Sequence, residues 1–291
     1  MRFVVLLFTF FTLLFSFEVE DIKASATTVA NGKTIFLEFK KRNEREYKKV
    51  TVGKKEFKVF SNPFDTTRSY ALVPFSYYEK LETKKLEIEY KEGKKLQFKE
   101  IFLDVINGNY LKEEIQVSSK KVNPKSKEVK QRISKEYNEA MKIYTTVTPN
   151  SYIKEPFILP LESKITSAFG KARVYNGSLK GYHSGTDFRA KMGTPIIASN
   201  DAEVALVQKR FYSGGTVLLN HGQGIYTCYF HMSEFRVKKG DSVNRGDLLG
   251  LSGKSGSVTG PHLHFSARIN GVQVDPLQLI ELLNKNLLKR K

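Results

Sequence analysis

The sequence predicts a mainly β protein, with an N-terminal β-sandwich-like domain, a linking helix and a C-terminal antiparallel β domain. Three observations support this prediction: alternating apolar and polar residues early in the chain, a helical apolar spacing in its middle, and short glycine-punctuated segments near its end. We expect the N-terminal domain to span residues 18–118, the helical linker residues 119–150, and the C-terminal domain residues 151–291.

Residues 1–17 have the pattern of an export signal. Arg2 precedes an apolar run from Phe3 to Phe15, and small Ser16 and several acidic residues follow. The run is short for a membrane span and matches the basic and apolar regions of a secretory signal peptide. Leu14 fits the cleavage site poorly, so an uncleaved anchor that holds the chain near a membrane is the alternative. In both cases we expect the rest of the chain to be exported, to the periplasm or cell envelope.

The chain is strongly basic, with a formal net charge of +18 at pH 7. The two predicted domains share this excess almost equally, so it does not come from a charged tail. For an exported protein, such a charge favours an anionic polymer of the envelope as partner and argues against nucleic acid. Cys228 is the only cysteine, which excludes an intramolecular disulfide and leaves stabilisation to the cores or to a metal.

The predicted N-terminal domain contains two clear strand regions. In KKVTVGKKEFKVF (48–60) and KKLEIEYKEGKKLQFKEIFL (84–103), apolar and polar residues alternate around turn-like breaks. This pattern is typical of a small β-sandwich. The region contains no histidine, so we expect it to serve in binding, spacing or regulation.

The spacing of apolar residues predicts a helix over residues 123–144. Asn123 is the expected N-cap, and Pro124 fits the first turn. One apolar stripe, which should pack on a domain, follows at helical spacing and consists of Val129, Ile133, Tyr137, Met141 and Tyr144. A proline-bearing connector at 148–160 then marks the domain boundary.

The C-terminal domain contains all five histidines of the chain, between His183 and His264. Two Gly-Asp steps ending at Asp241 and Asp247 predict a repeated short hairpin. Asp275 as N-cap and Pro276 at the first helical position predict a short helix at the end of the domain.

Three short segments supply candidate metal ligands. HSGTD contains His183 and Asp187, YFH contains His231, and HLH contains His262 and His264. Residues at even offsets on a strand point to one face, so each pair could converge on one ion. Zinc takes three or four ligands of these types, and a catalytic site keeps one position for water. The alternative is that these are isolated histidines.

The segments HSGTDF, YFHM and GPHLHF, in this order, resemble the lysostaphin-like zinc metallopeptidases, which cut peptide bonds in peptidoglycan. The resemblance covers residues 157–280 and includes SAFGKAR (167–173), GTPIIAS (193–199) and VDP (274–276). More loosely, the β-rich N-terminal domain and the charged helix resemble periplasmic members from Gram-negative bacteria. Those members usually act on crosslinks between D-Ala and meso-diaminopimelate, which implies a D,D-endopeptidase with possible carboxypeptidase activity.

The resemblance also implies site residues and a cofactor. His183, Asp187 and His264 occupy the positions of the ligands to one zinc ion per chain. His231 and His262 occupy the positions of the catalytic pair, in which one histidine orients or deprotonates water and the other stabilises the oxyanion. Which of the two acts as the base stays open. Zinc lowers the pKa of bound water to about 7, so a neutral imidazole is a competent base.

Three other chemistries fit the sequence less well. Cys228 and His231 are three residues apart, which would point them to opposite faces of a continuous strand. GKS at 253–255 lacks the glycine that a phosphate-binding loop needs, because Leu248 stands in its place. The two Gly-Asp steps are similar to those of lipoyl carriers, but such carriers have no use for this set of histidines.

The remaining alternative is a non-catalytic wall-binding protein that activates another hydrolase. Family members of that kind have lost ligands, whereas every ligand and catalytic position is filled here, which favours an enzyme. Because other elements precede the catalytic domain, we expect partial self-occlusion of its cleft. We interpret His221 as structural or peripheral, and neither Tyr175 nor Tyr182 can be assigned as an oxyanion ligand.

Overall fold

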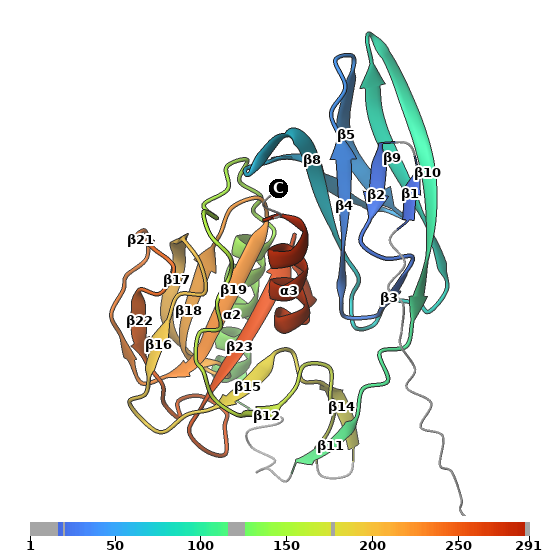
Figure 1. Cartoon of the computed structure of the whole chain (residues 1–291). Helices are drawn as coiled ribbons and strands as arrows, with labels where there is room; N and C mark the ends of the chain where they lie inside the picture. The colour runs from blue at the N-terminus through green and yellow to red at the C-terminus, as the bar shows by residue number, and fades with distance from the viewer. Residues whose placement is uncertain (1–16, 20, 116–125, 176–177, 289–291) are drawn as a thin grey trace, which may run out of the picture.

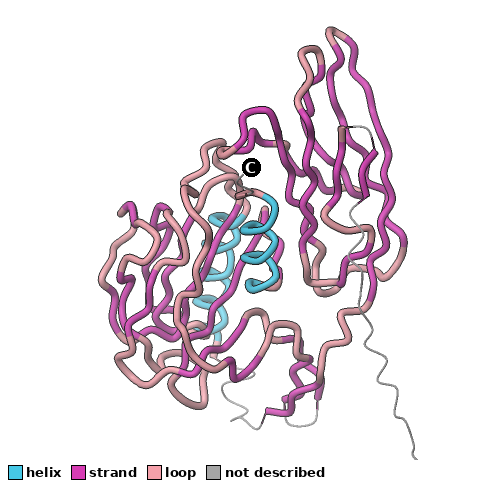
Figure 2. Tube along the Cα trace, viewed as in Figure 1, coloured by secondary structure: helices cyan, strands magenta, loops and turns pink. Residues whose placement is uncertain are grey.

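The computed structural model describes residues 17–19, 21–115, 126–175 and 178–288. Its described part is mainly β, as the sequence predicts, with two helices (Figure 2). The predicted signal segment lies outside the described residues except for Phe17. Among the described residues, no helix is long and apolar enough to cross a membrane.

The N-terminal region is a sandwich of two five-stranded sheets, which confirms the predicted architecture. The first sheet has the order β1 (Phe17–Val19), β2 (Ile22–Ala24), β4 (Thr34–Lys40), β8 (Asp65–Pro74), β7 (Phe60–Asn62). The second has the order β3 (Thr28–Ala30), β10 (Lys95–Ile106), β9 (Thr83–Glu92), β5 (Arg45–Val52), β6 (Lys55–Lys58). Alternation decides which side chains fill the core: on β10, Ile101, Leu103 and Val105 are buried, whereas the residues between them are exposed.

The C-terminal region is built on an eight-stranded antiparallel sheet. Its order is β12 (Ile165–Ser167), β15 (Thr186–Arg189), β23 (His262–Ile269), β19 (Ile225–Met232), β18 (Gly214–Asn220), β17 (Ala202–Arg210), β21 (Ser242–Val243), and β24 (Val272–Val274) also pairs with β23. A smaller sheet consists of β16 (Pro195–Ile197), β22 (Leu248–Leu251) and β20 (Glu234–Phe235). Apolar side chains of both sheets, including Val217, Phe265, Ile196 and Leu249, form one continuous core.

Helix α2 (Lys127–Tyr144) covers part of the face of the large sheet that points away from this core (Figure 1). At its C-terminal end, Tyr144 packs against a cluster formed by Leu206, Leu218, Tyr226 and Cys228.

Two details of the predicted linking helix are corrected. The helix begins at Lys127, and Ser126 is the N-cap, because its hydroxyl accepts a hydrogen bond from the backbone N–H of Val129. The expected cap at Asn123 and Pro124 lies outside the described residues. Tyr137 is 62% exposed and does not belong to the packing stripe, since at this level Glu136 turns to the sheet and accepts a hydrogen bond from the N–H of Phe211.

Helix α3 (Pro276–Asn286) confirms the predicted C-terminal helix and joins the two β regions. The Asp275 carboxylate caps it by accepting hydrogen bonds from the N–H groups of Leu277 and Gln278. The Gln278 side chain makes two hydrogen bonds to the backbone of Thr34 on β4, at 2.9 and 3.0 Å. Figure 1 shows α3 lying between the sandwich and the large sheet, so it fixes one against the other.

The two Gly-Asp steps form equivalent turns but not hairpins. Asp241 accepts a hydrogen bond from the N–H of Lys238, and Asp247 accepts one from the N–H of Asn244. The strands after these turns pair elsewhere: β21 pairs with β17, and β22 pairs with β16 and β20. The repeated sequence therefore forms the same side-chain-capped turn twice. The predicted hairpins do not form, because the strands that follow pair with other strands.

A fifth sheet, of three strands, connects the chain that leaves the sandwich to the C-terminal region. It has the order β11 (Lys112–Ile115), β13 (Ala172–Tyr175), β14 (Ser178–Tyr182), and β11 pairs with β13 in parallel. The division expected from the sequence assigns β11 to the N-terminal domain, yet its hydrogen-bonded neighbour belongs to the C-terminal region. This small sheet leads directly into the first predicted metal ligand.

Candidate metal centre and catalytic site

The three predicted ligands lie together on adjacent elements. Asp187 on β15 is the register partner of His264 on β23, and His183 follows the end of β14. Asp187 Oδ1 lies 3.0 Å from His183 Nε2 and 2.8 Å from His264 Nδ1, and the two imidazole nitrogens are 3.0 Å apart. One potential ligand atom from each of the three residues therefore lies within 4.8 Å of the other two.

This group fits a zinc ion in both chemistry and size. Two imidazoles and one carboxylate are common zinc ligands, with bonds of about 2.0 Å. A tetrahedron of that size needs ligand atoms about 3.3 Å apart, so the observed separations require an opening of a few tenths of an ångström. All three residues are buried or half-buried, which protects such a centre from competing ligands.

The hydrogen bonds around His183 fix its orientation. Its Nδ1 lies 2.8 Å from the backbone oxygen of Ala168 and therefore carries the proton that it donates. The lone pair of Nε2 is then directed toward Asp187 and His264. This is the arrangement in which a backbone acceptor orients a metal-binding imidazole.

The electrostatics keep Asp187 ionised. Burial alone would raise the pKa of this carboxyl, but the adjacent His183 and His264 imidazoles outweigh burial and hold the pKa well below its usual range. Burial also lowers the pKa of the His264 imidazole, against the opposing effect of Asp187. The pair therefore presents an anionic oxygen and a neutral nitrogen, the forms that bind metal.

The two predicted catalytic histidines stand beside this group. His262 shares a face of β23 with His264, as the even spacing predicts. Its Nδ1 lies 2.9 Å from the backbone oxygen of Gly260, and its Nε2 lies 3.6 Å from Asp187 Oδ1. The His231 ring lies 4.8 Å from the His262 ring, and its Nδ1 contacts the backbone oxygen of Ser255 at 2.9 Å. Both imidazoles are thus oriented through Nδ1, which leaves Nε2 for the site.

A β-bulge directs His231 into the site. The register between β18 and β19 shifts so that Phe230 and His231 together stand opposite Thr216, and His231 has φ +64°. A bulge re-aims side chains, and a residue other than glycine with positive φ is uncommon. The backbone strain therefore lies at the residue whose side chain departs from the in-out alternation of the strand. Because of this departure, the rings of both Phe230 and His231 approach the His264 ring.

Gly185 makes the close approach of β15 and β23 possible. A Cβ atom at this position would lie 2.6 Å from His264 Nε2 and 2.3 Å from the backbone oxygen of Phe265. Both distances are far below van der Waals contact, so a side chain here displaces the His264 ring or the strand behind it.

We expect Gly185→Ala to lower the affinity for zinc by about 10- to 100-fold, the range seen when groups that orient ligands are disturbed. Competition with a chelating dye would measure this affinity. Gly260→Ala is the matched control, because nothing lies within 4 Å of a Cβ atom there and its backbone is not in the left-handed region. Equal zinc affinity in the two variants would contradict the steric argument.

Other residues singled out in the sequence lie away from this centre. His221 is fully buried between Asp201 O and Thr227 Oγ1, at 2.9 and 2.7 Å, so it is structural. Cys228 packs under α2, and burial raises the pKa of its thiol to about 11, which argues against a nucleophile. Tyr182 stacks on Tyr77 of the sandwich at 4.0 Å, and the Tyr175 side chain lies outside the described set.

His221 should make stability depend on pH. Burial lowers its pKa to about 4 from the ordinary 6.5, so the folded state binds fewer protons than the unfolded state between these values. The contribution of neutral His221 to the free energy of unfolding is fully present above pH 6.5 and is lost as the pH falls toward 4. We expect His221→Gln to lower the Tm at pH 7.5 and to flatten its decline between pH 6.5 and 4.5. Thermal unfolding of chelated samples would measure this, and equal declines in both proteins would contradict the assignment.

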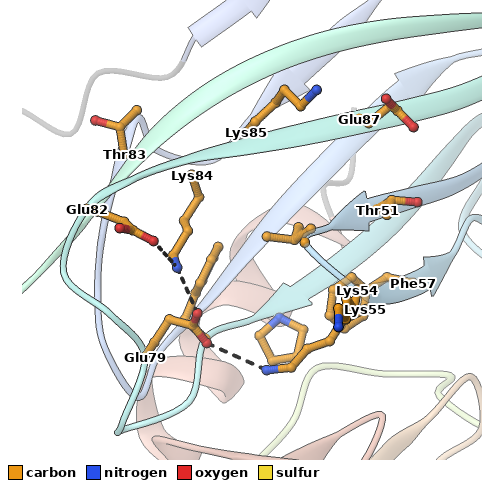
Figure 3. A pocket seen from close by; sticks show the side chains of 14 residues that line it. Thr51, Lys54, Lys55, Phe57, Glu79, Glu82, Thr83, Lys84, Lys85 and Glu87 are labelled. Atoms are coloured by element: carbon orange, nitrogen blue, oxygen red, sulfur yellow. Dashed lines mark hydrogen bonds and ion pairs between the residues drawn. The ribbon is translucent and has the colours of Figure 1, made fainter.

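A cavity of about 550 Å³ lies in the sandwich, away from the five histidines. Four of its charged groups pair with one another: Lys84 contacts Glu79 and Glu82 at 3.0 and 2.9 Å, and Lys55 contacts Glu79 at 3.6 Å (Figure 3). Because these side chains neutralise each other, the cavity offers no reactive group comparable to the histidine cluster.

Two neighbours of the ligands were not predicted as site residues. Ser167 Oγ lies 3.2 Å from His183 Nδ1, and Arg173 Nη2 lies 3.7 Å from Asp187 Oδ2. Both belong to SAFGKAR, a segment that contributes to the family resemblance but contains no metal-ligating residue type. Ser167 lies on β12 and Arg173 on β13, and spacing alone does not reveal that these two strands approach the ligands.

Comparison with known sequences identifies the region that carries this centre. Residues 181–276 match peptidase family M23. Peptidoglycan DD-endopeptidase ShyA of Vibrio cholerae is 39% identical over 122 residues, which cover 41% of this chain and 28% of ShyA. DD-carboxypeptidase/endopeptidase Mpg of Neisseria meningitidis is 39% identical over 97 residues, which cover 33% of this chain and 22% of Mpg. The matched regions thus span less than a third of these relatives.

The similarity to solved structures extends further along the chain. A crystal structure of an M23 peptidase candidate from Pseudomonas aeruginosa has a TM-score of 0.66 and is 26% identical. It covers 87% of this chain, and this chain covers 95% of it. The similarity therefore includes the N-terminal sandwich as well as the region with the histidines.

Proposed function

We propose that the chain is a zinc-dependent hydrolase of peptidase family M23 that cuts the peptide crosslinks of peptidoglycan, since residues 181–276 match that family. The observation that carries this proposal is the convergence of His183, Asp187 and His264 on one small volume, with His231 and His262 beside it. Peptide hydrolysis needs an electrophilic centre and groups that move protons, and this arrangement supplies positions for both.

His183, Asp187 and His264 are the proposed ligands of one zinc ion. The ion would polarise the scissile carbonyl and make an attacking water more acidic. The chain's own contribution is to hold these ligands oriented, through the hydrogen bond from His183 Nδ1–H to the Ala168 oxygen and through the packing of His183 and His264 against Asp187. Their mutual contacts support a single shared ion.

His231 and His262 are the proposed catalytic pair. Burial first, and then the nearby His264 and His262, lower the pKa of His231 to about 3, so this imidazole is neutral at the pH of the envelope. A neutral imidazole whose Nδ1–H is held by a carbonyl can accept a proton at Nε2 or donate a hydrogen bond after protonation. One histidine therefore takes the proton of the attacking water, and the other stabilises charge on the former carbonyl oxygen.

The names of the relatives support a particular bond. ShyA is named a peptidoglycan DD-endopeptidase and Mpg a DD-carboxypeptidase/endopeptidase. On this basis we propose D,D-endopeptidase activity at crosslinks between D-Ala and diaminopimelate, with trimming of terminal D-Ala as a second activity. The basic surface of the chain supports binding to an anionic wall polymer.

We further propose export to the envelope through residues 1–17. Residues 18–118 would then form a β-rich domain, residues 119–150 a helical linker, and residues 151–291 the peptidase domain. The separate core of the sandwich supports this division, although Phe36, Tyr70 and Leu72 belong to the core of the peptidase region.

Digestion of purified sacculi by the full chain with stoichiometric zinc tests the proposal. We expect soluble muropeptides to be released in proportion to time and enzyme, and release to stop when a chelator removes the zinc. Binding to sacculi without turnover, together with stimulation of another wall hydrolase, would instead identify a non-catalytic activator and contradict the proposed function.

A further inference from the structure

We propose that Ser167, Lys171 and Arg173 form a subsite for a carboxylate of the substrate peptide, and that Glu113 fills this subsite in the structure described. The inference deepens the proposed function and rests on it for the identity of the peptide. It also assigns a specific mechanism to self-occlusion, because Glu113 lies on β11, which connects the sandwich to the peptidase region.

The Glu113 carboxylate is surrounded by three donors of the peptidase region. Its two oxygens lie 3.2 Å from Ser167 Oγ, and Lys171 Nζ and Arg173 Nε lie 3.4 and 3.3 Å away. The side chain is only 26% exposed. A hydroxyl, an ammonium and a guanidinium around one carboxylate form an anion-binding site of three donors, and charge-assisted hydrogen bonds are stronger than neutral ones.

The backbone around Glu113 also has the form of a bound peptide. β11 is an extended segment of four residues that pairs in parallel with the edge of β13, where Glu113 is opposite Arg173. β14 occupies the other edge of β13, so β11 takes the edge that an incoming strand would use. Addition of an extended peptide to an open strand edge is a common mode of recognition.

The subsite adjoins the proposed metal ligands on two sides. Ser167 Oγ lies 3.2 Å from His183 Nδ1, and Arg173 Nη2 lies 3.7 Å from Asp187 Oδ2. A carboxylate bound here would therefore be separated from the ligands by one side chain in each direction. Such a position suits a group on the substrate peptide that flanks the bond to be cut.

The charge balance explains why a substrate carboxylate could replace Glu113. Arg173 lies between the carboxylates of Glu113 and Asp187, and Lys171 contributes a second cation. If β11 leaves, Lys171 and Arg173 both lose the Glu113 carboxylate, and a carboxylate of the peptide takes its place. Stem peptides of the wall carry several free carboxylates, so the ligand has the required charge and extended form. β11 then competes with the substrate as a tethered segment of the same chain.

The test compares Glu113→Gln with Glu114→Gln in the full, zinc-loaded chain. Glu114 is the next residue of β11 and is exposed, so it is the matched control. The probes are the wall tetrapeptide L-Ala-D-Glu-diaminopimelate-D-Ala and two analogues, one amidated at the terminal carboxyl and one at the diaminopimelate carboxyl. Isothermal titration calorimetry gives each dissociation constant, and metal analysis gives the zinc content.

We expect Glu113→Gln to bind the free tetrapeptide roughly tenfold more tightly than the wild type, as removal of a competing segment predicts. Glu114→Gln should match the wild type, and Lys171→Gln should weaken binding of the free peptide. Amidation of the carboxylate that binds should remove this gain, and a gain that both amides retain assigns the subsite to the D-Glu carboxylate.

Loss of zinc in Glu113→Gln would overturn the proposal, because Glu113 would then support the metal ligands instead of occupying a subsite. Equal affinities in Glu113→Gln and Glu114→Gln would overturn it as well. A tenfold gain in peptide affinity, in a protein that does not digest sacculi, would support the subsite and contradict the proposed function. The two failures are therefore distinguishable.

Discussion

Replacement of His264 by alanine is expected to empty the metal site and abolish digestion of sacculi. Two of the three ligand-to-ligand contacts involve its Nδ1, to Asp187 Oδ1 and to His183 Nε2. Without this nitrogen only two protein ligands are left, fewer than a zinc site needs. Metal analysis of the dialysed variant should find less than stoichiometric zinc, and release of muropeptides should fall to the background of untreated sacculi.

His262→Ala is the matched control on the same face of the same strand. In the unsubstituted chain, His262 Nε2 lies 3.6 Å from Asp187 Oδ1, and His262 is not one of the three proposed ligands. We therefore expect zinc to stay bound and kcat to fall by about 10²- to 10⁴-fold, the usual contribution of a general acid or base. Equal loss of zinc in the His264 and His262 variants would contradict the division of roles between them.

His231→Asn is expected to have the second large effect, with retention of zinc and a fall in kcat of about 10²- to 10⁴-fold. Asparagine tolerates the positive φ of this position, so the β-bulge should persist while proton transfer is lost. Steady-state kinetics on a crosslinked muropeptide would separate kcat from KM. An unchanged kcat would exclude His231 from the chemistry, and loss of zinc would show that it supports the metal.

The face on which proposed site residues lie could be predicted from the sequence where their geometry is local. Two histidines at offset two on one strand must share a face, and His262 and His264 do so on β23. The ends of α3 are predictable for the same reason, since Asp275 and Pro276 act on their immediate neighbours.

Features that depend on tertiary pairing could not be predicted. His231 leaves the alternation of β19 at a bulge, whose position depends on the register with β18. Tyr137 has helical spacing but is exposed, because Glu136 takes the contact with the sheet. The contact of Glu113 with Arg173 joins residues from the two predicted domains, and local pattern contains no information about such an approach.

The proposed peptidase activity is tested by mass analysis of muropeptides from purified sacculi that the zinc-loaded full chain has digested with and without chelator. We expect crosslinked dimers to be converted to monomers with a new D-Ala carboxyl terminus, and the chelator to prevent this conversion. Dimers that persist in the zinc-loaded digest, or products cut in the glycan strand instead of the peptide, would contradict it.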